Sequence, residues 1–123
     1  MQRSMIPILA ASLVTFGCAS YPIPTQSLAD AQSAERSATE LGAASQPKAQ
    51  LHLQLAHEQI AQASAAMKDG DNARADALLL RAKSDAELAI ALTRDQGAKT
   101  EAQKAVDQSN SQRSINANQG ASQ

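Results

Sequence analysis

The fold is decided by residues 53–79, which read LQLAHEQIAQASAAMKDGDNARADALL. In the first part of this stretch, apolar side chains recur at alternating three- and four-residue steps, at Leu53, Ala56, Ile60, Ala63 and Met67. This spacing places them on one face of an α-helix. The letters KDGDN then supply a basic residue, a glycine and an aspartate in the order in which one helix ends and the next begins. The stretch therefore predicts an antiparallel helical hairpin.

The two arms of this hairpin extend in both directions. Pro47 suits the first turn of a helix, so the first arm is expected to begin there. The second arm carries an apolar seam and a flanking leucine strip, which offers a further contact to a third helix or a partner chain. Gly97 either ends the second arm or weakens it, in which case the helix continues through Val106. The seam is Ala75, Leu79, Ala82, Ala86, Ala89 and Thr93, and the strip is Leu78, Leu88 and Leu92.

A third helix is expected on the N-terminal side. Ser27 and Asp30 match the S-x-x-D capping box, so this helix is predicted to start at Ser27. Residues 42–45, which read GAAS, are expected to end it. Its apolar stripe is Leu28, Ala31, Ala34, Ala38 and Leu41. The prediction is an all-α fold over residues 27–108, a small three-helix bundle in which the third helix packs against the hairpin.

The C-terminal residues and the N-terminal residues are expected to lie outside this bundle. Residues 109–123 are rich in serine, asparagine and glutamine, which predicts a disordered tail. At the other end, Arg3 precedes an uncharged, mainly apolar run over residues 5–16. A basic start and a short apolar stretch followed by small residues are typical of a secretory signal peptide, here residues 1–17. The apolar run is too short to span a bilayer.

The only cysteine of the chain follows this signal. Residues 13–20 read LVTFGCAS and resemble a lipobox, in which the cysteine becomes the lipidated first residue of the mature chain. Gly17 is the small residue expected before it, whereas the two residues before Gly17 depart from the commonest pattern. Cys18 is therefore the predicted lipidation site. A diacylglyceryl group and a further acyl chain such as palmitate would anchor it firmly, because each buried methylene contributes about 0.8 kcal/mol.

Two alternatives to lipidation stay open. Residues 18–20 also form a small-x-small triplet, so ordinary cleavage after Ser20 would release a soluble secreted protein. The other alternative is an uncleaved anchor in which Cys18 has no role. If Cys18 is lipidated, no aspartate follows it as in an inner-membrane retention signal, so the periplasmic face of the outer membrane is the expected location. Residues 18–26 would then be the lipidated cysteine and an extended, proline-containing tether.

The composition argues against several classes of function. Aromatic residues make up 2% of the chain, and both of them, Phe16 and Tyr21, lie near the N-terminus. Ligand pockets are usually lined by large apolar and aromatic groups, so the alanine-rich body predicts thin helix seams, no cofactor and no enzyme activity. The 11 basic and 12 acidic residues nearly balance. Without a basic run to follow phosphates or aromatic residues to stack on bases, nucleic-acid binding is not expected.

The polar residues of the helices are expected to serve structure. His52 and His57 are the only histidines, and their five-residue step places them about 140° apart around a helix, so they cannot bind one metal ion together. Residues 69–72 read DGDN but lack the spacing and closing glutamate of a calcium loop, so no metal site is expected. Three ion pairs are expected on the exposed side of the second arm: Arg81–Asp85, Lys83–Glu87 and Asp95–Lys99.

Several motifs resemble a known family. They are LADA at residues 28–31, Pro47 at the start of a helix, KDGDNARA at residues 68–75 and SDAELA at residues 84–89. Together they look like the family catalogued as domain of unknown function 4398, over roughly residues 28–92. Its members are typically bacterial envelope lipoproteins with no settled activity. The resemblance therefore sharpens the expected fold and location more than the function.

The leading functional hypothesis is a non-enzymatic outer-membrane lipoprotein. It would be tethered through Cys18 and would present its helices to the periplasm as an interaction or structural module. Its partners would be the membrane, through the lipid anchor, and an envelope protein. A second hypothesis is a self-associating coiled coil, in which alanine seams pair between chains. A third is an enzyme, for which the sequence offers no recognisable nucleophile or phosphate-binding loop.

Overall fold

The computed structural model describes residues 20–121, and these residues form helices without any strand. The elements are α1 (Thr25–Glu40), the short 3-10 helix η1 (Ala43–Ser45), α2 (Pro47–Lys68) and α3 (Asn72–Gly120). The predicted all-α class is confirmed. The predicted signal peptide and Cys18 lie outside the described residues.

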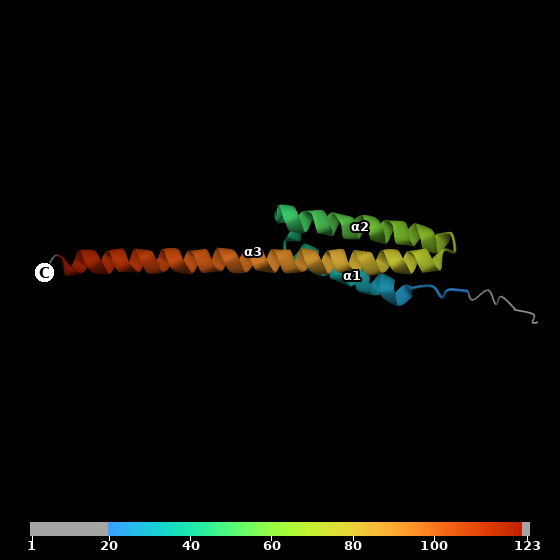
Figure 1. Cartoon of the computed structure of the whole chain (residues 1–123), viewed down its shortest axis with the longest axis horizontal. Coiled ribbons are helices and arrows are strands. Elements are labelled where there is room, and N and C mark those ends of the chain that lie inside the picture. Colours follow the sequence, from blue (N-terminus) through green and yellow to red (C-terminus); the bar gives the residue numbers. More distant parts are fainter. Residues whose placement is uncertain (1–19, 122–123) are drawn as a thin grey trace, which may run out of the picture.

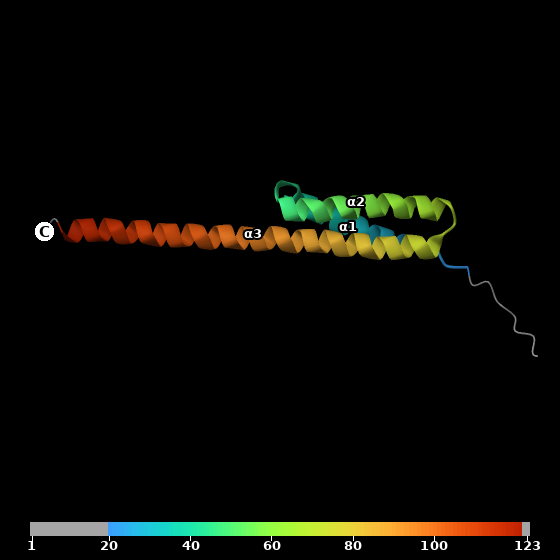
Figure 2. The same ribbon diagram turned by 45° about the horizontal axis from the view of Figure 1, so that its top comes forward.

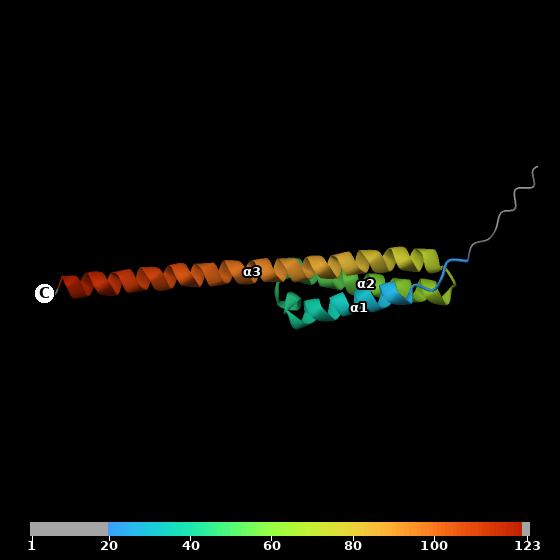
Figure 3. The same ribbon diagram turned by 90° about the horizontal axis from the view of Figure 1, so that it is seen from below.

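The arrangement is a long rod with two shorter helices at one end. α1 and α2 pack beside the N-terminal half of α3 (Figure 1). α2 runs antiparallel to α3 after the turn at residues 69–71, whereas α1 runs in the same direction as α3. Two rotated views keep both short helices against the same part of α3 (Figure 2 and Figure 3). The molecule is thus three helices thick at one end and a single helix at the other.

Alanine fills most of the seams between these helices. Among the described residues, 11 of the 14 buried side chains are alanine, and the other three are Pro24, Ile60 and Leu79. Because alanine is so small, the helix backbones lie close together and the core is thin. One cluster near the α2–α3 turn comprises Ala31, Ile60, Ala63, Ala66, Ala75, Leu79 and Ala82. A second, toward the other end of the bundle, comprises Ala38, Ala43, Ala49 and Ala89.

The seams predicted from the apolar spacing agree with the buried residues. The α3 seam is buried at each predicted position from Ala75 to Ala89, and Thr93 is half-buried. In α2 the predicted alanines and Ile60 are buried. The larger residues at the two ends of that seam, Leu53 and Met67, are half-buried and pack against the clusters. A helical period of 3.6 residues therefore locates the core of each helix.

Two leucines expected to pack are exposed instead. Of the two contacts predicted for the leucine strip, Leu88 does not make the one with a third helix, since it is 42% exposed; a contact with a partner chain stays a prediction. Ten residues separate it from Leu78, which leaves the two about 80° apart around α3, so Leu88 lies on the outer side of the helix. Leu41 is also exposed, because α1 ends at Glu40 and Leu41 is the cap residue beyond it.

Both turns of the bundle use the residues predicted to form them. Gly42 after α1 has a φ of +85°, and Gly70 after α2 has a φ of +79°. This left-handed region is strained for a residue that carries a Cβ atom. Pro47 occupies the first turn of α2. The Asp71 side chain accepts a hydrogen bond of 3.2 Å from the backbone N–H of Arg74 and so caps α3.

The start of α1 differs from the prediction. The helix begins at Thr25, two residues before the expected Ser27, and Pro24 is its cap residue. The predicted capping box is wrong, because Ser27 already lies inside the helix and its hydroxyl donates to Asp76 of α3. Asp30 likewise bonds to side chains, one of them four residues before it and one on α3. Long-range partners have displaced the local cap.

The C-terminal part of α3 also differs from the prediction. Residues 109–120, expected to be disordered, form the last turns of α3, which passes through Gly97 without a break. No proline follows Pro47 in the sequence, so every later residue can donate to the backbone ladder. Side-chain amides also bridge successive turns, Gln103 to Asp107 at 2.9 Å and Gln112 to Asn116 at 3.1 Å. Such local bonds stabilise a polar helix that buries nothing.

The core assignment can be tested at two adjacent leucines. Leu79→Ala should destabilise the bundle by about 2–5 kcal/mol, because it truncates the one large side chain that is fully buried among the described residues. Leu80 is 56% exposed, so Leu80→Ala is the matched control and should cost less than about 0.5 kcal/mol. Urea unfolding followed by circular dichroism measures both values. An equal loss in the two variants would contradict this core.

Candidate functional site

The segment before α1 is bound to the start of α3. The Tyr21 hydroxyl donates to Asp76 Oδ2 at 2.5 Å, and the Ser27 hydroxyl donates to Asp76 Oδ1 at 2.5 Å. The side-chain amide of Asn72 donates to the backbone oxygen of Tyr21 at 3.0 Å. Residues 20–24, which form neither helix nor strand, are therefore held beside the α2–α3 turn. We call residues 20–24 the docked segment.

The hydrogen bonds at Asp76 shift the pKa values of this group. The hydrogen bond to Asp76 raises the pKa of Tyr21 above its ordinary value of 10.0, and partial burial and the nearby negative charge act in the same direction. The hydrogen bonds from Ser27 and then Tyr21 lower the pKa of Asp76 below its ordinary value of 3.8, against a smaller effect of desolvation. Docking therefore favours an ionised Asp76 and a neutral Tyr21.

These shifts set the pH range in which docking is stable. The contribution of Asp76 is present above pH 3.8 and is lost as the pH falls through its lowered folded pKa. The contribution of Tyr21 is present below pH 10.0 and is lost as the pH rises through its raised folded pKa. The docked segment is thus held throughout the neutral range.

The sequence pattern does not predict this network. Tyr21 falls in the predicted tether, and Asp76, which lies 55 residues away in the sequence, has no predicted role. The one available signal is the position of Asp76, one residue after the seam residue Ala75, at the border of the buried face. That position does not reveal which side chain it meets.

A second polar network joins α2 to both of its neighbours. His52 Nδ1 lies 2.8 Å from Asp85 Oδ1, and the Gln59 amide donates to Asp85 Oδ2 at 2.8 Å, so this carboxylate links α2 to α3. His57 Nδ1 lies 2.7 Å from Glu35 Oε1 and links α2 to α1. The two histidines thus lie on different sides of α2, in agreement with their spacing.

The interhelical links change the predicted ion pairs. Asp95 and Lys99 form the expected pair at 2.6 Å. The Arg81–Asp85 pair is wrong, because Asp85 is bonded to residues of α2. The Lys83–Glu87 pair is also wrong, since Lys83 Nζ lies 3.4 Å from Asp30 of α1. Tertiary partners have replaced neighbours on the same helix.

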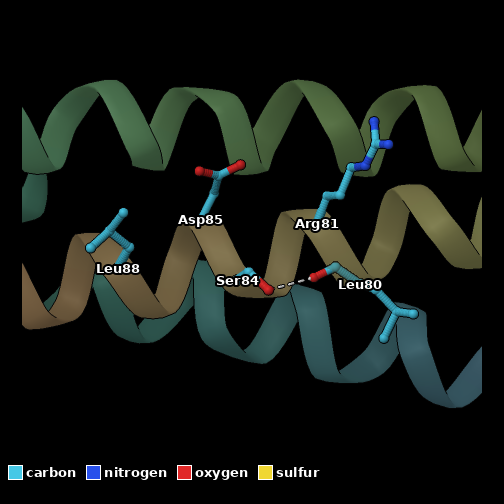
Figure 4. Close-up of a pocket in the computed structure, with 5 residues that line it drawn as sticks. All are labelled: Leu80, Arg81, Ser84, Asp85 and Leu88. Carbon is cyan, nitrogen blue, oxygen red and sulfur yellow. Dashed lines mark hydrogen bonds between the residues drawn. The ribbon is translucent and has the colours of Figure 1, made fainter.

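The outer side of α3 carries an open, shallow depression between Leu80 and Leu88 (Figure 4). Ser84 lies at its centre, and its hydroxyl donates to the backbone oxygen of Leu80 at 3.0 Å. Arg81 and Asp85 point from the rim toward α2 (Figure 4). We call this exposed side of α3 the free face. An open apolar surface of this kind suits contact with another helix better than enclosure of a small molecule.

Beyond the bundle, α3 continues as a single helix. Residues 100–120, which we call the distal arm, are exposed at every position. The arm adds about 30 Å to the rod at 1.5 Å per residue. Val106, 52% exposed, is 18 residues or five turns from Leu88, so the free face continues onto the arm.

The described part of the chain was also searched for membrane spans and metal clusters. None of the helices within residues 20–121 combines the length and the apolar character needed to cross a bilayer. Over the same residues, no three histidine, cysteine, aspartate or glutamate side chains gather in a way that could hold a metal ion. Cys18, the predicted lipidation site, lies outside them.

The comparison with protein families gives a clear match. The profile described as "Domain of unknown function (DUF4398)" matches residues 26–105, which are 80 of the 123 residues. The chain belongs to this family. The match extends the resemblance noted over residues 28–92 at both ends. No curated protein and no solved structure matches the chain.

The DUF4398 segment coincides with the bundle. It begins at Gln26, within the first turn of α1, and ends at Ala105, inside the distal arm. Asp76 and Asn72 lie within the DUF4398 segment, whereas Tyr21 lies before it. The docked segment therefore lies outside the matched region, but it is bound by residues within that region.

The docking of Tyr21 can be measured directly, because Tyr21 is the only tyrosine of the chain. Titration followed by tyrosinate absorbance should give a midpoint above 10.0. In Asp76→Ala the midpoint should return to about 10. Asp95→Ala, which removes an exposed carboxylate on the same helix, is the control and should keep the raised midpoint. The same midpoint in all three proteins would show that Tyr21 is not docked on Asp76.

Proposed function

We propose that this DUF4398 protein is a non-enzymatic envelope lipoprotein, anchored through Cys18 in the outer membrane with its helices in the periplasm. One observation carries the proposal: the chain leaves the bundle at Ser20, two residues after Cys18, from a segment that Tyr21 and Asn72 fix to the end of the bundle. An anchor at Cys18 would therefore hold the whole bundle by one defined end.

The shape of the molecule supports a role in contacting other proteins. α3 starts at the docked end and runs about 70 Å to Gly120, at 1.5 Å per residue. Along this length it presents the free face and the distal arm, both exposed. The thin alanine core leaves little apolar surface for enclosing a substrate, whereas exposed leucines at helical spacing suit a helical partner. We therefore assign the protein to binding or scaffolding and not to catalysis.

The anchor can be tested by replacing the thiol. Cys18→Ser should move the protein from the outer-membrane fraction to the soluble fraction or leave it unprocessed, because the acyl chains have no attachment point. Ser20→Ala is the matched control and should stay in the membrane fraction. Mass spectrometry of the mature N-terminus should find acylated Cys18 in the unaltered protein. An unmodified N-terminus at Tyr21 would instead establish cleavage after Ser20 and a soluble secreted protein.

Self-association is the second candidate function, and the free face favours it. Small residues recur there every seven positions, and all of them are exposed. A seven-residue repeat forms a continuous seam when two helices coil around each other, and small side chains let them approach closely. Leu80, Leu88 and Val106 lie beside this repeat and would add apolar contact. The repeat is Ala77, Ser84, Ala91, Ala98 and Ala105.

Sedimentation of residues 21–123 separates the two candidates. A monomer at micromolar concentration is expected if the protein acts on a different partner, and it would rule out obligate self-assembly. If a dimer forms through the free face, Leu88→Asp should convert it to monomers, because a buried unpaired charge is costly. Leu51→Asp makes the same change at a leucine of α2 that is 57% exposed; it is the control for a nonspecific effect of the added charge and should leave the distribution unchanged.

A further inference from the structure

We propose that the end of the bundle formed by the docked segment and the α2–α3 turn lies against the lipid surface, with α3 standing away from it. This end contacts the headgroup layer of the leaflet that holds the acyl chains of Cys18. The inference rests on the lipidation of Cys18 proposed above, and it adds the orientation of the protein and the surface that meets the membrane.

The length of chain between the anchor and the bundle is the first argument. Only two residues lie between Cys18 and Tyr21, and the three steps along the chain span at most about 11 Å. Tyr21 is fixed to Asp76 and, through its backbone oxygen, to Asn72. If Cys18 is at the lipid surface, this short link therefore places the first turns of α3 close to the headgroups.

The docked segment removes the freedom that a tether would give. If residues 18–24 were an open spacer, they would reach more than about 20 Å and the bundle could take any orientation. In the structure, the hydrogen bonds of Tyr21 to Asp76 and Asn72 leave only two residues between Cys18 and the first fixed residue, Tyr21. The orientation of the bundle thus depends on these contacts.

The chemistry of this end suits the headgroup layer. Ile23 is 62% exposed and the Tyr21 side chain, although its hydroxyl is bonded to Asp76, is 46% exposed, so both present apolar surface within five residues of Cys18. Tyrosine is favoured at membrane–water interfaces because its ring is apolar and its hydroxyl is polar. The exposed charges of the turn are of both signs, and therefore neither attract nor repel the surface strongly: Lys68, Asp69, Asp71 and Arg74.

The distal arm has no surface that would hold it flat on the bilayer. A helix that lies in the interface carries a broad apolar face opposite a charged one. The arm has only Val106 and Ile115 as exposed large apolar residues, nine residues and therefore about 180° apart. The arm therefore extends away from the lipid.

Two fluorescent labels on the full-length, membrane-extracted protein test this geometry. Ala73→Cys places a label in the first turn of α3, and Ala117→Cys places a matched label near its other end; both positions are exposed. The proteins are reconstituted in vesicles that carry a nitroxide quencher on the headgroups. The label at residue 73 should be strongly quenched and the label at residue 117 should keep its fluorescence. Asp76→Ala, added to each, should reduce quenching at residue 73 because it releases the docked segment.

The possible outcomes separate this inference from the proposed function. Mass spectrometry on the same samples shows whether Cys18 is acylated. Acylation together with quenching at residue 73 alone supports both the proposed function and the orientation. Acylated Cys18 with equal quenching at the two labels means that the rod lies flat, and acylation with quenching at neither means that the bundle is held off the surface. Either result overturns the orientation and leaves the anchor intact. A Cys18 without acyl chains overturns the proposed function and the orientation together.

Discussion

The close approach of three helices along alanine seams is the constraint on which the rest of the structure depends. A methyl group occupies little space, so neighbouring backbones can lie closer than leucine would allow. The same small size limits the apolar area that folding removes from water. The bundle therefore gains a defined geometry from its seams but a modest hydrophobic stabilisation, and only Leu79 and Ile60 add larger buried side chains.

Carboxylates at the borders of the seams fix the register between helices, which the alanines alone leave unspecified. Asp76 joins α3 to Ser27 of α1, Asp85 joins α3 to His52 of α2, and Glu35 joins α1 to His57 of α2. Each pair of helices thus has its own polar link. Because small apolar residues are nearly interchangeable along a seam, an alanine core alone would let one helix slide along another. Directional hydrogen bonds at each interface favour one register.

Local patterns in the sequence predict the parts of this fold that depend on near neighbours. The apolar period locates the buried faces of α2 and α3, and glycine, proline and aspartate locate the turns, because each of these effects acts within one or two helical turns. The partners of Asp76 and Asp85 depend on how separate helices meet, so the sequence pairs Asp85 wrongly with Arg81 and leaves Asp76 without a role. The helical state of residues 109–120 is missed because composition does not register the bonds between successive turns. Whether Leu88 contacts a third helix or stays exposed likewise depends on where α1 packs, which the local pattern does not determine.

The unbroken course of α3 through Gly97 has a mechanical consequence. One rigid element joins the packed bundle to the distal arm, so the arm cannot reorient without turning the bundle or bending the helix where no second helix supports it. A small tilt at the docked end becomes a large sideways displacement at Gly120, as with a lever. Because Asp76 lies near the start of the same helix, a tilt of the arm also acts on the hydrogen bonds that join α3 to Tyr21 and Ser27.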